Sequence, residues 1–281
     1  MNRRCFLKNC FGAGVFLGGT KVWLPSVSTW KRAEWVWPRI GFGKPTQYDV
    51  SALALTSGIS NYWWYDWAAT NRDFNYIPMV WGCGGTVDPL LNDGRPLFVL
   101  NEPERLDQAK ASPQRAADTL YKWAGIWRGE LYPLGTLVQS IEYVDATIDC
   151  YESKYGPWPG SGWAVHAYAG RADWSVDVPM RLQVVVDDLQ IFWDHLQSRG
   201  LGGRGFVLSE CGVLSAQRWH SPSALVPAMD WMAEEFKKLP FVLSWCWFSS
   251  FYKPLNSSDL LWEDGSLTEL GIKWRELVGV S

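Results

Sequence analysis

Short apolar segments alternate with longer amphipathic segments from residue 39 to the end of the chain. The short segments have the length and composition of buried strands, and the longer ones carry apolar residues at helical spacing. Residues 180–199 are one example, because Leu182, Val185 and Leu189 share a face and Gly200 follows the last turn. The pattern predicts strands at residues 40–43, 62–67, 76–81, 96–101, 136–141, 162–168, 205–211 and 241–248. It predicts helices at residues 48–55, 112–128, 143–155, 180–199, 221–238 and 266–278.

Eight strands separated by mostly helical segments indicate parallel pairing with right-handed crossovers. The chain has 281 residues, and a closed barrel of eight strands and eight helices typically needs ~250. We therefore expect an α/β fold, a single (β/α)8 TIM barrel over residues 29–281. A doubly wound open sheet is the alternative. It is disfavoured because no Gly-x-Gly-x-x-Gly pattern follows the first strand.

Two of the apolar strands lead directly into acidic residues. Residues 98–100 are apolar and are followed by Asn101 and Glu102, and residues 206–208 are followed closely by Glu210. The C-terminal ends of parallel strands meet at one rim of a barrel, where catalytic groups usually lie. We therefore expect both glutamates to face the same cleft.

Two carboxyl groups across a cleft are what the cleavage of a glycosidic bond requires. One carboxyl protonates the leaving oxygen, and the other attacks the anomeric carbon or activates water. A separation of ~5–5.5 Å makes the second carboxylate a nucleophile, with retention of configuration. The alternative for Asn101 and Glu102 is a polar pair that only caps the next helix.

Several nearby polar and aromatic residues fit the same chemistry. Asn101 is expected to hydrogen-bond a sugar hydroxyl, while His166 and Tyr168 are placed to orient the carboxylate of Glu210. Trp247, on the last strand, is expected to form the floor of the subsite where the bond breaks. The chain contains 20 Trp, and flat apolar rings often line sugar-binding clefts, although core packing is the competing explanation for each. The further aromatic candidates for the cleft are Trp63, Trp64, Tyr65, Trp67 and Trp81.

The charge distribution along the chain disfavours some classes of binding partner. The whole chain has a net charge of -3, from 26 basic and 29 acidic residues. Residues 1–28 contain four basic residues and no acidic one, so residues 29–281 have 22 basic and 29 acidic residues, a net charge of -7. This balance argues against nucleic acid or an anionic membrane surface as partner. It suits a soluble protein that acts on an uncharged substrate such as a polysaccharide. We also expect the protein to be a monomer.

The N-terminus has the features of an export signal. Arg3 and Arg4 are followed by Phe6, Leu7 and Lys8, which resembles the twin-arginine pattern read by an export receptor. The apolar stretch at residues 11–17 is too short for an ordinary membrane span, so no stable membrane insertion is expected. We expect residues 1–28 to be the signal and the protein to be periplasmic or extracellular. An uncleaved tail is the alternative.

No metal or organic cofactor is expected, because two carboxyl groups suffice for glycoside hydrolysis. Four cysteines follow the predicted signal, and their scatter matches no zinc pattern of paired close cysteines. They are Cys83, Cys150, Cys211 and Cys246.

Together these motifs resemble a known group of enzymes, the clan A glycoside hydrolases, and within it family 128. The stretches that carry the resemblance span residues ~40 to 275 and are residues 62–67, 77–82, 98–103, 163–168, 206–210 and 245–248. The resemblance implies a (β/α)8 barrel with Glu102 as general acid/base and Glu210 as nucleophile. It also implies β-1,3-glucan as substrate.

The chain departs from the family pattern at a few positions. Glu104 stands where the family usually has Asp, and Ser209 and Cys211 flank the second glutamate in place of Thr and Phe. Ala164 and Ala167 stand where Thr and Trp are usual. Both glutamates are present, so we expect a retaining endo-β-1,3-glucanase. The alternatives are another clan A specificity, for β-mannan, β-xylan or β-1,4-glucan, and a non-catalytic glycan-binding barrel.

Overall fold

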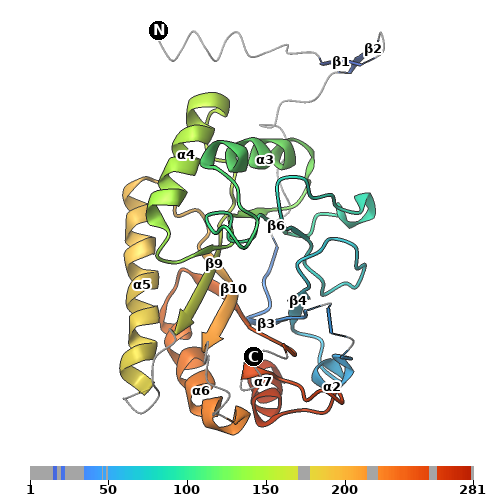
Figure 1. The fold of residues 1–281 in the computed structure, drawn as a ribbon, viewed down its shortest axis with the longest axis vertical. Helices are drawn as coiled ribbons and strands as arrows, with labels where there is room; N and C mark the ends of the chain where they lie inside the picture. The colour runs from blue at the N-terminus through green and yellow to red at the C-terminus, as the bar shows by residue number, and fades with distance from the viewer. Residues whose placement is uncertain are drawn as a thin grey trace.

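The protein has an α/β fold in which mostly parallel strands are covered by helices (Figure 1). The computed structural model describes residues 15–17, 20–22, 35–45, 47–48, 50–169, 178–213, 221–252 and 258–279. Two short strands near the N-terminus, β1 (Val15–Leu17) and β2 (Thr20–Val22), form an antiparallel pair. The remaining strands are β3 (Ile40–Gly43), β4 (Trp63–Tyr65), β5 (Met79–Val80), β6 (Leu97–Val99), β7 (Leu131–Pro133), β8 (Thr136–Leu137), β9 (Trp163–Ala169), β10 (Phe206–Val213) and β11 (Val242–Trp247).

The parallel strands form two sheets and not one closed ring. The larger sheet has the order β4-β3-β11-β10-β9-β8, and the smaller one has the order β5-β6-β7. Within the described residues, a single bridge between Trp64 and Tyr76 joins the β4 side to the segment before β5. Pro78 and Pro133, which have no N–H to donate to a ladder, lie next to the two breaks. The parallel α/β arrangement is therefore confirmed, whereas the expected closed barrel is not.

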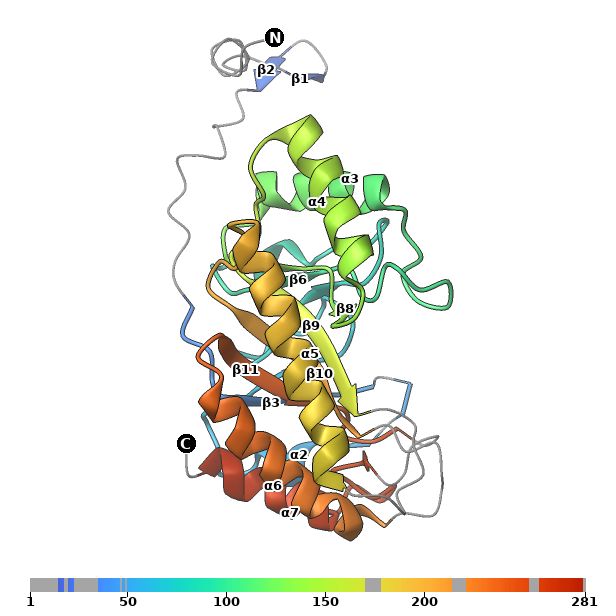
Figure 2. The same ribbon diagram turned by 90° about the vertical axis from the view of Figure 1, so that its left-hand side faces the viewer.

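The helices lie outside the strands (Figures 1 and 2). Ser112 caps α3, where its side chain accepts a hydrogen bond from the backbone N–H of Arg115, and Pro113 occupies the first turn as the sequence predicts. No helix in the described ranges is both long enough and apolar enough to cross a membrane. The helices are α2 (Leu53–Thr56), the 3-10 turn η2 (Pro89–Leu91), α3 (Pro113–Ile126), α4 (Ile141–Tyr155), α5 (Val178–Ser198), α6 (Pro222–Lys238) and α7 (Glu269–Gly279).

Side chains alternate along the strands between two apolar clusters. The inner cluster is enclosed by the strands and contains Trp63, Tyr65, Ile77, Met79, Phe98, Tyr132, Ala164, Val207 and Cys246. The outer cluster lies between strands and helices, and includes Trp64 and Trp247 together with helix residues such as Leu120 and Leu189. Because successive strand residues point to opposite faces, the parity of a position decides which cluster it joins.

Most predicted elements are found with ends within three residues of the prediction, and two regions differ. The helix predicted at residues 48–55 is only the single turn α2. The strand predicted at residues 136–141 is only β8, because α4 begins at Ile141. The strand β7 was not predicted, since it ends in Pro133 and Leu134 follows with a positive φ of 78°. The predicted export signal at residues 1–28 falls largely outside the described residues and stays a prediction.

Candidate active site

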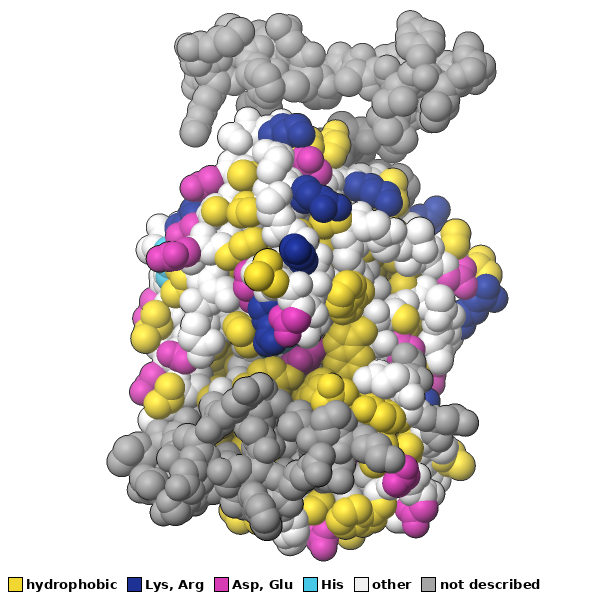
Figure 3. All heavy atoms as spheres, in the orientation of Figure 1, with side chains coloured by type: hydrophobic (Ala, Val, Ile, Leu, Met, Phe, Trp, Pro, Cys, Tyr) yellow, Lys and Arg dark blue, Asp and Glu magenta, His cyan; other side chains and the backbone are white. Residues whose placement is uncertain are grey.

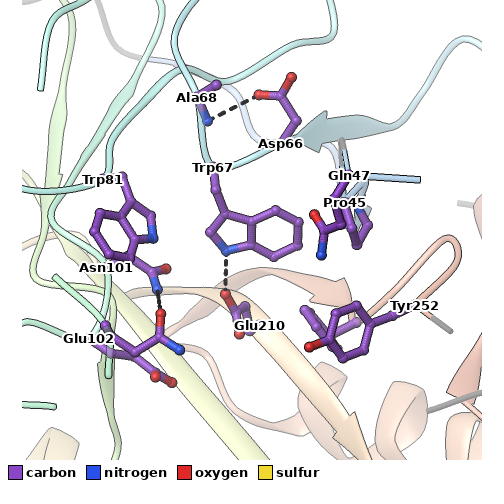
Figure 4. Close-up of a pocket in the computed structure, with 12 residues that line it drawn as sticks. Pro45, Gln47, Asp66, Trp67, Ala68, Trp81, Asn101, Glu102, Glu210 and Tyr252 are labelled. Carbon is purple, nitrogen blue, oxygen red and sulfur yellow. Dashed lines mark hydrogen bonds between the residues drawn. The ribbon is translucent and has the colours of Figure 1, made fainter. Parts of the chain in front are cut away.

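A pocket of about 420 Å³ opens at the C-terminal ends of the strands (Figure 4). On the face seen in Figure 3, hydrophobic side chains gather around the middle of the molecule with acidic side chains among them. The residues of the pocket supply both kinds of group that a neutral sugar needs, flat apolar surface and hydrogen-bonding atoms. Its lining residues are Pro45, Gln47, Asp66, Trp67, Ala68, Trp81, Asn101, Glu102, Gln108, Glu210, Phe248 and Tyr252.

Glu210 reaches the pocket through an irregularity in β10. Regular alternation from the inward-facing Val207 would turn Ser209 inward and Glu210 outward. The register of β10 against β9 shifts between Leu208 and Glu210, so that Glu210 pairs with His166. A bulge of this kind re-aims a side chain, and here it brings the carboxylate to the inner side.

Three neutral donors hold the Glu210 carboxylate. The hydroxyl of Tyr65 and the indole N–H of Trp67 donate to Oε1 at 2.9 and 2.7 Å. The hydroxyl of Tyr168 donates to Oε2 at 2.5 Å. Burial, and then the charge of Glu210, raise the pKa values of Tyr65 and Tyr168 well above their usual range, so both phenols keep their protons. A set of donors without an acceptor matches an ionised carboxylate, which only accepts.

Glu102 lies where the chain leaves β6 with an unusual backbone. Leu100 and Glu102 have positive φ values of 73° and 41°, which are uncommon for residues other than glycine. The N–H of Glu102 donates to the carbonyl of Gly135 at 2.9 Å. A side chain at Gly135 would approach the Leu100 carbonyl at 3.0 Å, so a glycine permits this close contact.

Two basic side chains hold the Glu102 carboxylate. The His166 Nδ1 atom lies 2.9 Å from Oε1, and the Arg105 Nε atom lies 3.3 Å from Oε2. The same His166 Nδ1 atom lies 3.4 Å from Oε2 of Glu210. Burial lowers the pKa of His166. The carboxylates of Glu210 and Glu102 raise this pKa by more than burial lowers it, so the net shift is upward. The two glutamates therefore favour the protonated form of the imidazole that lies between them.

The three central side chains, Glu102, His166 and Glu210, lie close together. One oxygen each of Glu102 and Glu210 and one ring nitrogen of His166 lie within 4.8 Å of one another. Such atoms are also a possible ligand set for a metal ion. Here they are already engaged with Arg105, Tyr65, Trp67 and Tyr168, and glycosidic cleavage by paired carboxyl groups needs no metal.

The structure brings most, but not all, of the sequence-predicted residues to this site. Trp67, Trp81 and Asn101 line the pocket with the two glutamates, and Trp81 is 39% exposed. His166 and Tyr168 contact the carboxylates from behind the lining.

Trp64 and Trp247 are not part of the lining. Trp64 stacks on Phe42 and packs at a tilt against Tyr76 in the outer cluster, since its neighbour Trp63 occupies the inward position. Trp247 is buried in the same cluster, where its indole N–H donates to the Ser258 carbonyl at 2.8 Å. Both tryptophans occupy alternating strand positions whose side chains point away from the inner cluster.

The seven other lining residues were not among the sequence-based candidates, and they are Pro45, Gln47, Asp66, Ala68, Gln108, Phe248 and Tyr252. Phe248 follows Trp247 and has the inward parity, so alternation along β11 could have identified it. Tyr252, Gln47 and Gln108 come from connections after strands and carry no motif. Gln108 accepts a hydrogen bond from the Asn101 amide at 3.3 Å, which orients that amide.

The wall that carries Phe248 and Tyr252 is anchored by a buried carboxyl group. The backbone N–H of Tyr252 donates to Oδ1 of Asp259 at 2.7 Å, whereas Oδ2 is buried with no partner among the described residues. Burial raises the pKa of Asp259 to about 8. The Asp259 carboxyl group therefore stays protonated in neutral solution, so the wall contains an uncharged acid and not a buried charge.

The chain is similar to one known protein family and to several solved structures. Residues 41–144 match the family profile described as the glycosyl hydrolase catalytic core. A family-128, subgroup I endo-β-1,3-glucanase from Amycolatopsis mediterranei superposes with a TM-score of 0.63 at 19% identity, covering 85% of this chain and 99% of that one. A subgroup II endo-β-1,3-glucanase from Sorangium cellulosum gives 0.61 at 22% identity, covering 84% and 97%. A subgroup III exo-β-1,3-glucanase from Blastomyces gilchristii gives 0.62 at 17% identity, covering 84% and 97%.

A search of curated proteins gave no match. At identities of 17 to 22%, the structural likeness shows a common fold. The resemblance to family-128 glycoside hydrolases that the sequence predicts is confirmed as a likeness of fold over 85% of the chain, and the glycosyl hydrolase profile matches residues 41–144.

Proposed function

We propose that this protein is a retaining glycoside hydrolase that cleaves β-1,3-glucan at internal bonds. The observation that carries the proposal is the pair of carboxylates, Glu102 and Glu210, in one pocket with an oxygen of each within 4.8 Å of the other. Inverting enzymes keep their carboxyl groups ~6.5–9.5 Å apart to admit a water molecule, whereas retaining enzymes keep them ~5–5.5 Å apart. The short separation here favours retention.

In the first step, Glu210 is the nucleophile. Its carboxylate oxygen attacks the anomeric carbon while Glu102 transfers its proton to the departing glycosidic oxygen. The bond between the anomeric carbon and that oxygen breaks, and a glycosyl ester on Glu210 forms. Asn101 has a buried Oδ1 with no partner within the described part of the chain, which can accept a hydrogen bond from a sugar hydroxyl.

In the second step, Glu102 acts as a base. It takes a proton from water while the water oxygen attacks the anomeric carbon and releases Glu210. The sugar leaves with the configuration it had at the start, and both carboxyl groups return to their initial states. His166, which bridges the two carboxylates, compensates the negative charge that moves between them.

The substrate class is supported by the pocket lining and by the relatives. Trp67, Trp81 and Phe248 supply apolar ring surface, while Gln47, Gln108 and Asp66 supply hydrogen-bonding atoms for hydroxyl groups. The Amycolatopsis enzyme has been crystallised with laminaritriose, laminaripentaose and laminarihexaose. We therefore favour β-1,3-glucan over the β-1,4-linked polymers.

The test is a panel of laminarin, curdlan, β-mannan, β-xylan and cellulose, read by the release of reducing ends. We expect the fastest release from the β-1,3-glucans, with oligosaccharides of mixed length as early products. Glu102→Gln and Glu210→Gln should abolish most of the release, whereas Glu152→Gln, the same change at an exposed position on α4, should leave it unchanged. Equal rates on a β-1,4 polymer, or an active Glu210→Gln variant, would refute the proposal.

Export through a twin-arginine system is part of the same proposal. Replacing both Arg3 and Arg4 by Lys keeps the charge but removes the arginine pair that the receptor reads. In a bacterium with this pathway, we expect the wild type in the exported fraction and the variant in the cytoplasm. Export of the double variant at the wild-type level would contradict it.

A further inference from the structure

Phe248 has a fixed place in the pocket wall, beside the strand that carries Glu210. It lines the pocket, and its backbone N–H donates to the carbonyl of Cys211 at 2.9 Å. Cys211 is the residue that follows Glu210 in β10. The ring of Tyr252, whose backbone is anchored by Asp259, packs edge-to-face against Phe248 with the ring centroids 5.6 Å apart. The Phe248 ring is therefore held close to the backbone of the proposed nucleophile.

The ring of Phe248 also contacts two of the three donors that bind the Glu210 carboxylate. It meets the ring of Trp67 edge-to-face, with centroids 5.6 Å apart and an angle of 77° between the ring planes. It meets the ring of Tyr168 in the same way, at 6.0 Å and 87°. Trp67 donates to Oε1 of Glu210 (Figure 4), and Tyr168 donates to Oε2. One ring thus packs against a donor for each oxygen of the carboxylate.

The third donor, Tyr65, is held by other residues. It is fully buried, and its ring packs against Trp63 and Phe98 of the inner cluster at centroid distances of 6.2 and 5.6 Å. It also touches Trp67, at 4.7 Å, but no ring contact joins it to Phe248 in the described part of the chain. Tyr65 is therefore fixed by the core, whereas the other two donors are only partly buried and meet the pocket wall.

We propose that Phe248 is a positioning residue that keeps Trp67 and Tyr168 turned toward the two oxygens of Glu210. This inference rests on the proposed function, in which Glu210 is the nucleophile. A partly exposed side chain has several staggered rotamers open to it, and a fixed ring packed against it excludes those that would occupy the same space. A carboxylate with donors on both oxygens meets the anomeric carbon in one orientation, and even a small misplacement of a reacting group slows the reaction.

The first test needs no substrate and follows the indole N–H of Trp67. Tryptophan is labelled with nitrogen-15 in the full-length protein, and the Trp67 signal is assigned by its loss in Trp67→Phe. Phe248→Leu removes the ring that packs against Trp67, so we expect this N–H to exchange with solvent at least ~10-fold faster. Phe248→Tyr, which keeps the ring, should restore most of the protection. An unchanged exchange rate in Phe248→Leu would overturn the inference.

Phe251→Leu is the matched control, because it makes the same change in the same wall. Phe251 packs edge-to-face on Tyr48 at 5.4 Å and is not among the lining residues. It should leave the exchange of the Trp67 N–H unchanged. The indole N–H of Trp127, which donates to a backbone carbonyl at 2.9 Å, is the internal reference in each spectrum. Faster exchange of Trp67 in Phe251→Leu, or equally faster exchange of Trp127 in Phe248→Leu, would mean a general loosening and would overturn the inference.

The second test is a double-mutant cycle read by kcat on laminarin. We expect Phe248→Leu to lower kcat ~10-fold in the wild-type background, but less than ~3-fold where Tyr168→Phe has already removed one of the positioned bonds. A ring that only touches the sugar would cost the same factor in both backgrounds, and that result would overturn the positioning role. Absence of any hydrolysis by the wild type would instead refute the proposed function. The exchange test still decides the inference in that case, so the two failures are distinguishable.

Discussion

The two glutamates of the pocket are held by opposite kinds of partner. Glu210 sits at a bulge in a long strand and accepts hydrogen bonds from three neutral donors, Tyr65, Trp67 and Tyr168. Glu102 sits on a turn with a positive φ and is held by the basic side chains of His166 and Arg105.

The difference follows the roles that the two groups are proposed to have. A nucleophile should stay ionised and fixed, and neutral donors whose pKa values are far above neutrality supply this without exchanging protons. An acid/base must gain and lose a proton in each cycle, and Glu102 has basic partners, His166 and Arg105, in place of neutral donors. The environment, more than the residue type, separates the functions of the two carboxyl groups.

The largest expected effect comes from truncating each glutamate and varying the leaving group. Glu102→Ala should cut the rate on laminarin ~100- to 10,000-fold, but much less on a dinitrophenyl glycoside, which leaves without a proton. Glu210→Ala should lose activity on both substrates, because no covalent intermediate forms. The measurement is kcat on each substrate, and a loss by Glu102→Ala that is equal on both would contradict its assignment as the acid.

Removing one neutral donor should have a smaller effect. Tyr168→Phe deletes the hydroxyl bonded to Glu210 Oε2, and a hydrogen bond to a charged group contributes about 1.5–3 kcal/mol. We expect kcat to fall ~10- to 100-fold with little change in the melting temperature. Tyr121→Phe, on the exposed face of α3, is the control for the same chemical change. An unchanged kcat in Tyr168→Phe would show that this donor does not support the nucleophile.

A pair of tryptophan variants compares the pocket with the outer cluster. Trp67→Phe removes the indole N–H that donates to Glu210 and should lower kcat ~10-fold at nearly constant stability. Trp64→Phe leaves a space in the outer cluster and should lower the free energy of unfolding by ~1–2 kcal/mol at nearly constant kcat. Both are read by urea denaturation and laminarin hydrolysis. A loss of kcat in Trp64→Phe and a loss of stability in Trp67→Phe would mean that the two tryptophans have been assigned to the wrong sides of the strand.

The last prediction concerns stability alone, through the pH dependence at Asp259. An unfolded Asp has a pKa of about 3.9, and burial raises that of Asp259 to about 8 in the folded protein. Below about pH 4 both states hold the proton. Between these values only the folded state does, so its stability falls as pH rises, by up to about 1.4 kcal/mol per pH unit. Asp259→Asn keeps an oxygen for the Tyr252 N–H and should remove this slope.

Urea denaturation at pH 5 and pH 8 checks the prediction for Asp259. We expect the advantage of Asp259→Asn over the wild type to be larger at pH 8 than at pH 5. Asp264→Asn, at an exposed turn, should show no such increase. An advantage that is equal at both pH values would mean that Asp259 is not the source of the slope.

The sequence supports the parallel α/β arrangement and the placement of both glutamates because apolar runs end abruptly in polar residues. Simple alternation also assigns Trp63, Tyr65 and Trp67 to one side of β4, and it would have excluded Trp64 and Trp247 from the pocket. The bulge that turns Glu210 inward has no sequence signal, since it depends on the register of β10 against two neighbours.

Other parts of the site depend on long-range packing and were not predictable. Gln47, Gln108 and Tyr252 come from connections whose path is set by contacts far along the chain. Arg105 meets Glu102 only because the turn after β6 brings residues three apart together. The expected closed ring is interrupted where Pro78 and Pro133 lie beside short strands, and strand lengths of two or three residues cannot be deduced from periodicity.

The central claim is that Glu210 forms a covalent bond to the sugar while Glu102 manages the proton. Its most direct test is a fluorinated β-1,3-linked disaccharide with a good leaving group, in which the 2-fluoro group slows the second step. Digestion of the treated protein and mass spectrometry should find the disaccharide attached to Glu210. A label on any other residue, or a first product of inverted configuration without a label, would contradict the account.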